Sequence, residues 1–218
     1  WLIGKFNPHA KDISSLRIVQ TAFKIICFIG GIHTTVIGYE NIPKDKPVLF
    51  IGNHRGFFDT IISYSMMPGI TGFVAKKEIE KVPLLRVWMR YLHCLFLDRA
   101  NIKEGLKTIL KGIDEVKAGV SMVIFPEGTR NKGDGIMPFK EGSFKIAEKS
   151  GCLIIPMVQN NTSAAFEDHF PFIRRTHTII EFGTPIDLTT LSKEDRKAIG
   201  AYTHSIMLKM YEKNQSLV

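Results

Sequence analysis

Cysteine is scarce in this chain. Its 218 residues include three cysteines, Cys27, Cys94 and Cys152, and no two of them are close in sequence. An odd number at such spacing argues against a disulfide framework and against a Cys-rich zinc site, and it fits a reducing compartment. No set of His, Cys and carboxylate residues has convincing metal-ligand spacing either, so we expect no metal site.

Long apolar runs are also missing. No window reaches the roughly 18 uninterrupted apolar residues that a membrane-spanning helix needs. The most apolar stretch, residues 18–37, is broken by polar side chains and by the pair Gly30-Gly31. Basic residues flank its apolar positions, so a helix there could lie in the membrane interface; the alternative is a helix that packs over one face of a sheet. Because the whole chain is basic, we expect residues 1–38 to form a helical membrane-docking segment.

Acidic residues are outnumbered by basic ones. Asp and Glu total 21 against 29 for Lys and Arg, which gives a formal net charge of +8. Such a balance favours anionic partners, namely nucleic acid, anionic lipid headgroups or phosphorylated substrates. Nucleic acid is disfavoured because the chain has no run of interleaved aromatic and basic residues and no recognisable binding module. An anionic membrane surface is therefore an expected partner.

The length and composition suffice for one large domain with a substantial core. Hydrophobic residues make up 44% of the chain, and a chain of this length is typical of one domain, with or without an appendage. No internal repeat and no low-complexity segment is present. The chain begins at Trp1 rather than at Met, which leaves open a signal or an anchor upstream.

Short apolar runs alternate with helical patterns along the rest of the chain. Runs typical of strands occupy residues 48–51, 72–75, 95–97, 121–125, 152–158 and 178–182. Patterns typical of helices occupy residues 60–67, 82–92, 102–117 and 141–149, and a last helix follows Ser192 as its cap. This alternation predicts an α/β domain over residues 39–218, with a mixed, largely parallel sheet flanked by helices.

A cluster of titratable residues follows the first predicted strand, where residues 53–59 read NHRGFFD. Open α/β sheets place ligands at the carboxyl ends of core strands. On one continuous helix the step from His54 to Asp59 turns the side chain by about 140°, so the two meet only if His54 lies in a loop and Asp59 in the first helical turn. Asp59 could then fix the tautomer of His54 and leave the other nitrogen as a base. The spacing alone is weak, because His93 and Asp98 repeat it.

A second charged turn follows the predicted strand 121–125. Residues 125–130 read FPEGTR. Gly128 allows close backbone approach, Arg130 could hold a phosphate with two hydrogen bonds, and Glu127 could accept a hydrogen bond from a substrate hydroxyl. Taken alone, such a stretch is more often an ordinary turn with a solvated arginine. Two charged strand ends could, however, lie side by side and form one site.

Together these residues resemble the PlsC-type glycerophospholipid acyltransferases, the family of the lysophosphatidic acid acyltransferases. NHRGFFD matches the NHxxxxD motif of that family, and FPEGTR matches its second signature. Four further segments stand in family order: VAKKEI at 74–79, FLDR at 96–99, FKEG at 139–142 and IIPMV at 154–158. The ordered set spans roughly residues 36–185 and is far more specific than any one motif.

The resemblance implies acyl transfer from a thioester, either acyl-CoA or acyl carrier protein, to the sn-2 hydroxyl of 1-acylglycerol 3-phosphate, giving phosphatidic acid. It implies a general base, His54, oriented by Asp59. The substrate-binding residues that it implies are Lys76, Arg99, Glu127, Gly128, Thr129 and Arg130, with Lys76 and Arg130 first for the phosphate. It implies no cofactor beyond the acyl donor and no metal. Because acceptor and product both partition into a bilayer, we expect a monotopic or peripheral enzyme on the cytoplasmic face of the cell membrane.

Two alternatives remain open at this point. The acceptor could be glycerol 3-phosphate or another lysophospholipid, or the chain could be a catalytically silent lipid-binding relative. The intact pair of His54 and Asp59 argues against a silent relative. A covalent acyl-enzyme is not expected, because the chain has no G-x-S-x-G nucleophile elbow.

Overall fold

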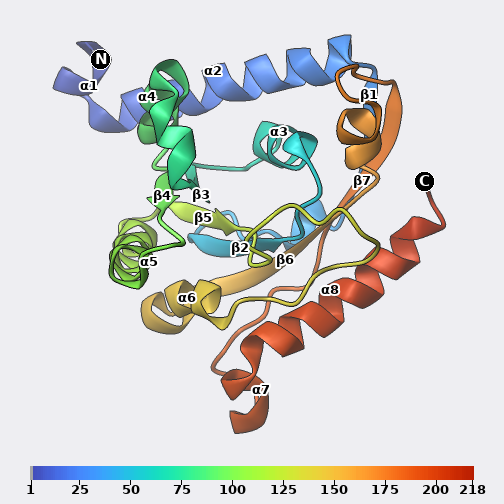
Figure 1. Ribbon diagram of the computed structural model, residues 1–218. Helices are drawn as coiled ribbons and strands as arrows, with labels where there is room; N and C mark the ends of the chain where they lie inside the picture. Colours follow the sequence, from blue (N-terminus) through green and yellow to red (C-terminus); the bar gives the residue numbers. More distant parts are fainter. Residues whose placement is uncertain (1) are drawn as a thin grey trace.

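The computed structural model describes residues 2–218, which form a seven-stranded sheet with helices on both faces (Figure 1). The strands are β1 (Ile32–Ile37), β2 (Val48–Gly52), β3 (Thr71–Lys76), β4 (Leu95–Leu97), β5 (Ser121–Ile124), β6 (Leu153–Asn160) and β7 (Thr176–Phe182). Their order across the sheet is β1-β7-β6-β2-β5-β3-β4. Strands β2 to β6 run parallel to one another, and β7 pairs with β6 in the antiparallel sense. The predicted mixed, largely parallel α/β fold is confirmed.

The helices divide between the two faces of the sheet, and Figure 1 shows α2, α3 and α4 on one side and α5, α6 and α8 on the other. Their bounds are α1 (Leu2–Phe6), α2 (Pro8–Ile29), α3 (Phe57–Ser65), α4 (Pro83–Tyr91), α5 (Ile102–Lys117), α6 (Lys145–Ser150), α7 (Lys193–Lys197) and α8 (Ile199–Gln215). Strand β4 and helix α5 have the predicted bounds. The predicted helix 141–149 is a 3-10 turn, Glu141–Phe144, followed by α6.

The N-terminal segment differs from the prediction. Asn7 caps α2 by accepting a hydrogen bond from the N–H of Ala10 at 2.9 Å, and the helix ends at Ile29. Gly31 has a φ of 67°, which favours glycine and turns the chain out of the helix. Residues 32–37, expected to continue the helical segment, instead form β1 and pair in parallel with β7. The sheet therefore extends across the predicted boundary at residue 38.

Helix α2 has one buried face and one exposed face. Leu16 is fully buried in the core, whereas Ile25, Phe28 and Ile29 are exposed. None of the helices between residues 2 and 218 contains a stretch long and apolar enough to cross a membrane. Membrane docking by this helix therefore stays a prediction.

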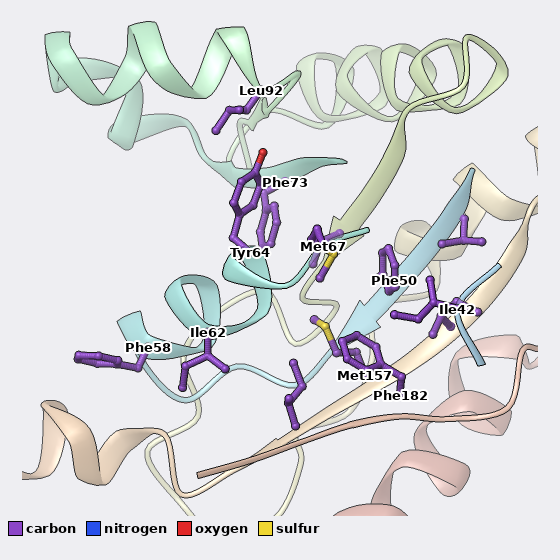
Figure 2. Packing of buried hydrophobic residues seen from close by; sticks show 14 of the residues in the cluster. Ile42, Phe50, Phe58, Ile62, Tyr64, Met67, Phe73, Leu92, Met157 and Phe182 are labelled. Atoms are coloured by element: carbon purple, nitrogen blue, oxygen red, sulfur yellow. The ribbon is translucent and has the colours of Figure 1, made fainter. Parts of the chain in front are cut away.

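Strand β2 is the centre of the core. All five of its residues are buried, because strands flank it on both edges and helices cover both faces. Phe50 points into a cluster with Phe73, Met157 and Phe182 beneath α2 and α3 (Figure 2). On the opposite face, Ile51 belongs to the cluster that packs beneath α5, α6 and α8. The strand that leads to the candidate site is thus held from both sides.

Replacing Phe50 by Ala should destabilise the fold strongly. The side chain has no exposed surface, so its removal leaves a cavity, and we expect the free energy of unfolding to fall by about 3–5 kcal/mol. Equilibrium urea unfolding measures the change. The matched control is Phe28→Ala on the exposed face of α2, which should stay within about 0.5 kcal/mol of the parent. A loss below about 1 kcal/mol for Phe50→Ala would contradict this account of the core.

Candidate active site

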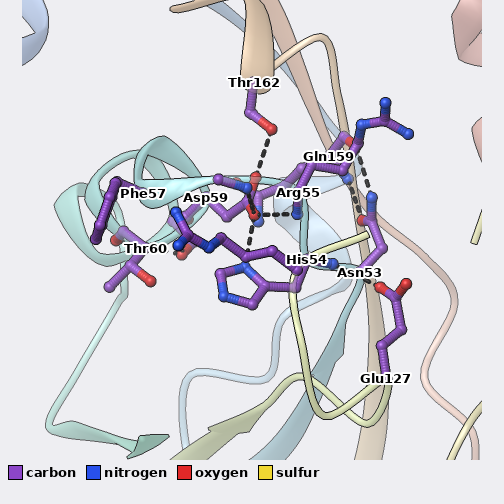
Figure 3. A network of polar contacts seen from close by, with 12 residues as sticks. Asn53, His54, Arg55, Phe57, Asp59, Thr60, Glu127, Gln159 and Thr162 are labelled. Atoms are coloured by element: carbon purple, nitrogen blue, oxygen red, sulfur yellow. Dashed lines mark hydrogen bonds and ion pairs between the residues drawn. The ribbon is translucent and has the colours of Figure 1, made fainter. Parts of the chain in front are cut away.

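The loop after β2 is anchored to the neighbouring strand β6 by one buried amide. Asn53 Nδ2 donates to the Gln159 carbonyl at 2.8 Å, and Asn53 Oδ1 accepts from the Gln159 N–H at 2.7 Å. Both bonds lie in the interior, where an unpaired amide would be costly. The pair fixes the point at which the chain leaves the sheet, and His54 comes directly after it (Figure 3).

His54 and Asp59 meet as the loop-to-helix geometry predicts. His54 lies in the loop, Asp59 lies in the first turn of α3, and the distance from His54 Nδ1 to Asp59 Oδ2 is 2.7 Å. The same carboxylate oxygen accepts the N–H groups of Arg55 at 2.6 Å and Gly56 at 2.7 Å. The Thr162 hydroxyl donates to the other oxygen, Oδ1 (Figure 3). Asp59 is fully buried, and these charge-assisted bonds supply the donors that a buried carboxylate needs.

The tautomer of His54 follows from this contact. An ionised carboxylate only accepts hydrogen bonds, so Nδ1 carries the proton that points to Asp59, and Nε2 carries the lone pair. The imidazole stacks on the Phe125 ring with centroids 4.4 Å apart and planes 13° apart. The His54 side chain is 22% exposed, and no residue of the described range 2–218 bonds to its Nε2. One ring nitrogen is therefore held, and the other is available as a base.

Glu127 supports the loop from the opposite side. Its Oε1 accepts the His54 N–H at 2.6 Å, and its Oε2 accepts the Met137 N–H at 2.9 Å. Burial raises the pKa of the Glu127 carboxyl above its ordinary value, and the bonds from Met137 and His54 act in the opposite direction. The sequence prediction gave Glu127 a contact with a substrate hydroxyl. In the structure the buried carboxylate binds two backbone amides and positions His54, and its contact with a substrate hydroxyl stays a prediction.

Gly128 is the point at which two cations converge. The Arg99 guanidinium donates to the Gly128 carbonyl, and a Cβ placed on Gly128 would lie 2.7 Å from Lys140 Nζ. Thr129 follows as an exposed residue. The turn after β5 therefore lies beside the His54 loop, as predicted, with Arg99 and Lys140 close to its backbone.

The other two predicted phosphate ligands, Arg130 and Lys76, do not lie with Arg99 at the Gly128 backbone. The Arg130 guanidinium lies 4.7 Å from the centroid of the Phe57 ring and 3.3 Å from Glu167 Oε1. Lys76 lies at the end of β3, where its exposed ammonium pairs with Glu78 at 3.0 Å. The predicted cations thus occupy separate positions along the carboxyl edge of the sheet.

Three residues of the site were not predicted. Thr162 bonds to Asp59, Phe125 stacks on His54, and Glu167 holds both Arg130 and the Phe57 N–H, the latter at 2.8 Å. Thr162 and Glu167 follow β6, whose carboxyl end is a neighbour of β2 in the sheet. A search of residues just after that strand could have found them, but Asp59 and Phe57, which they contact, lie more than a hundred residues away in sequence.

The mixed α/β sheet thus carries a His–carboxylate pair beyond a central strand, at the edge where such sheets place ligands. The acyltransferase family model matches residues 33–160, and the chain belongs to this family.

Three curated relatives share one enzyme name. The chain is 31% identical to a 1-acyl-sn-glycerol-3-phosphate acyltransferase of Saccharomyces cerevisiae, over 97% of this chain and 68% of the relative. It is 32% identical to the enzyme of that name from Haemophilus influenzae, over 91% of this chain and 82% of the relative. It is 29% identical to the enzyme of that name from Borreliella burgdorferi, over 91% of this chain and 79% of the relative. The crystal structure of the 1-acyl-sn-glycerophosphate acyltransferase PlsC from Thermotoga maritima superposes with a TM-score of 0.81 at 24% identity, over 92% of this chain and 79% of that one. This likeness supports the fold.

Removing the Thr162 hydroxyl should loosen the His–Asp pair. In Thr162→Val one donor to the buried Asp59 carboxylate is lost, and we expect unfolding free energy to fall by about 1.5–3 kcal/mol and acyl transfer to slow. Urea unfolding and initial rates measure the two effects. Thr162→Ser keeps the hydroxyl and should retain most of both properties. A valine variant as stable and as active as the parent would show that this bond has no positioning role.

Proposed function

We propose that the chain transfers a fatty acyl group from an acyl thioester to the sn-2 hydroxyl of 1-acylglycerol 3-phosphate. The observation that carries the proposal is the 2.7 Å contact from His54 Nδ1 to buried Asp59, which leaves Nε2 available in a chain of the acyltransferase family. The acceptor is inferred from the shared name of the relatives from Borreliella burgdorferi, Saccharomyces cerevisiae and Escherichia coli.

The reaction needs a base because an alcohol is a weak nucleophile at neutral pH. His54 Nε2 takes the hydroxyl proton while the oxygen attacks the thioester carbonyl, and Asp59 stabilises the imidazolium that forms. A C–O bond forms, the C–S bond breaks, and the imidazolium returns the proton to the departing thiolate. General-base help of this kind is worth about 10²–10⁴-fold in rate. The donor, acyl-CoA or acyl carrier protein, enters as a substrate.

The tetrahedral oxyanion needs hydrogen-bond donors. Near His54 the backbone N–H groups are committed, since those of Arg55 and Gly56 bond to Asp59 and that of His54 bonds to Glu127. Within the described part of the chain, the N–H groups of Thr129 and Arg130 carry no hydrogen bond. We therefore assign oxyanion stabilisation to the 129–130 backbone.

The acceptor phosphate needs cations near the acceptor hydroxyl. Arg99 and Lys140 are close to the Gly128 backbone, and Arg130 begins from the same turn. A phosphate in reach of Arg130 would compete with Glu167 for the guanidinium, whose ion pair at 3.3 Å is partly exposed and therefore weak. Lys76 remains a proposed ligand that must release Glu78 to contribute. Gly128 and Thr129 supply the backbone of this proposed phosphate site.

Acceptor-dependent thiol release tests the proposed reaction. With acyl-CoA and 1-acylglycerol 3-phosphate, we expect release from the parent and a loss of about 10²–10⁴-fold in His54→Ala. Asp59→Asn should also be impaired, because it removes the charge that stabilises the imidazolium. Activity with acyl carrier protein alone would keep the mechanism and identify the donor. Absence of release with both donors, also with glycerol 3-phosphate as acceptor, would overturn the proposal.

Helix α2 is the proposed membrane contact of this enzyme, on the cytoplasmic face of the cell membrane. Ile18, Ile25 and Ile29 form an exposed apolar stripe, with Lys24 beside it. Deleting the segment would be a poor test, because Leu16 belongs to the core and β1 to the sheet.

Polar substitution of the exposed stripe is the sharper test. The double variant Ile25→Ser, Ile29→Ser should sediment less with anionic vesicles, because the apolar area available for insertion falls. Ile102→Ser on α5, exposed on the opposite face of the sheet, is the control and should sediment as the parent does. Equal sedimentation of the double variant and the parent would contradict docking by α2.

A further inference from the structure

The loop between β6 and β7 exposes bulky apolar side chains. Phe170 is 74% exposed, Phe172 is 67% exposed, and Ile173 lies beside them with half its surface free. Contiguous exposed apolar groups of this size are uncommon on a monomer and mark contact surfaces. Neither the transfer chemistry nor the core uses these three residues.

This loop is continuous with the candidate active site. Strand β6 ends and β7 begins at the edge of the sheet where β2 ends, so residues 161–175 lie beside the His54 loop. The Phe166 ring lies 5.5 Å from the Phe170 ring and 6.1 Å from the Phe57 ring, as measured between centroids. Phe57 in turn carries the Arg130 guanidinium above its face. A row of aromatic rings thus leads from the exposed loop to a proposed phosphate ligand.

The same loop is also continuous with the end of α2. A Cβ placed on Gly30 would lie 3.1 Å from Ile173 Cγ2, and the Thr176 N–H bonds to the Gly31 carbonyl at 3.3 Å. Figure 1 shows this end of α2 next to β1 and the start of β7. We define the aromatic loop surface by five exposed residues of the two segments: Phe28, Ile29, Phe170, Phe172 and Ile173.

Basic residues border this surface. Arg174 and Arg175 are exposed, and neither of them forms an ion pair with another residue of the described range. Cations beside exposed aromatic groups match the headgroup region of an anionic bilayer, where aromatic side chains insert and Lys or Arg meets phosphate. A second copy of the chain would bring like charges together across a two-fold interface, which disfavours that occupant.

We infer that the aromatic loop surface is a second membrane contact, which inserts into an anionic bilayer and holds the His54 site at headgroup level. The inference rests on the proposed function, in which the acceptor is an amphipathic lipid. It adds a distinct role for residues 166–175. Helix α2 holds the enzyme on the membrane, and the loop positions the active site so that an acceptor in the bilayer enters it with the phosphate group directed toward Arg130.

Vesicle binding and two forms of the acceptor test the inference. The variant is Phe170→Ser with Phe172→Ser, and the matched control is Ile102→Ser with Leu106→Ser, two exposed apolar residues of α5. On phosphatidylcholine–phosphatidylglycerol vesicles we expect the loop variant to bind at least about tenfold more weakly and the control to bind as the parent. With Phe170→Leu and Phe172→Leu, which keep apolar groups, binding should be retained. Equal thermal midpoints establish that the variants are folded.

The activity readout separates docking from chemistry. With a short-chain, monomeric acceptor the loop variant should turn over at the parent rate, and with a long-chain acceptor in vesicles its rate should fall with binding. Unchanged binding of the loop variant, or equal losses in the control, would overturn the inference. A parent dimer that the loop substitutions dissociate would overturn it in favour of a second copy. Parent binding without any acyl transfer would support docking and refute the proposed reaction.

Discussion

The buried carboxylate of Asp59 is the interaction on which the site depends. A fully buried charge is tolerated only when several donors surround it, and those donors come from two segments of the chain. The Arg55 and Gly56 amides belong to the loop after β2, the His54 ring belongs to the same loop, and Thr162 belongs to the segment after β6. The charge that orients the base therefore also starts helix α3 and ties two strand ends together.

A second carboxylate, Glu127, works on the same loop from the turn after β5. It binds the His54 N–H, so the histidine is held through its backbone by the turn after β5 and through its ring by the first turn of α3. Pre-organisation of this kind reduces the reorganisation that a general base needs during reaction. The two turns therefore differ: the 54–56 amides bond to the two carboxylates that hold the base, whereas the 129–130 amides have no partner among residues 2–218.

Local patterns predicted most of the fold and the central pair of the site. Strand β4 was a short apolar run and helix α5 had a clear amphipathic period. The polar residues after β2 indicated a site because strand ends hold ligands. Strand β1 was missed because its apolar residues continue the composition of α2, and only the pair Gly30-Gly31 separates them. The bond from the His54 N–H to Glu127 was not predicted, because the two residues are 73 positions apart in sequence and local sequence patterns carry no information on such pairing.

The position of the site constrains how a lipid acceptor can reach it. His54, the end of α2 and the loop before β7 share one edge of the sheet. A bilayer that meets α2 along its exposed stripe therefore approaches the edge that carries the base, and the aromatic loop surface lies between the two. An acceptor whose acyl chain stays in hydrocarbon has its phosphate at the depth of the bordering cations. If the aromatic loop surface inserts as proposed, membrane depth and catalytic alignment are coupled, because the same row of rings ends on Arg130.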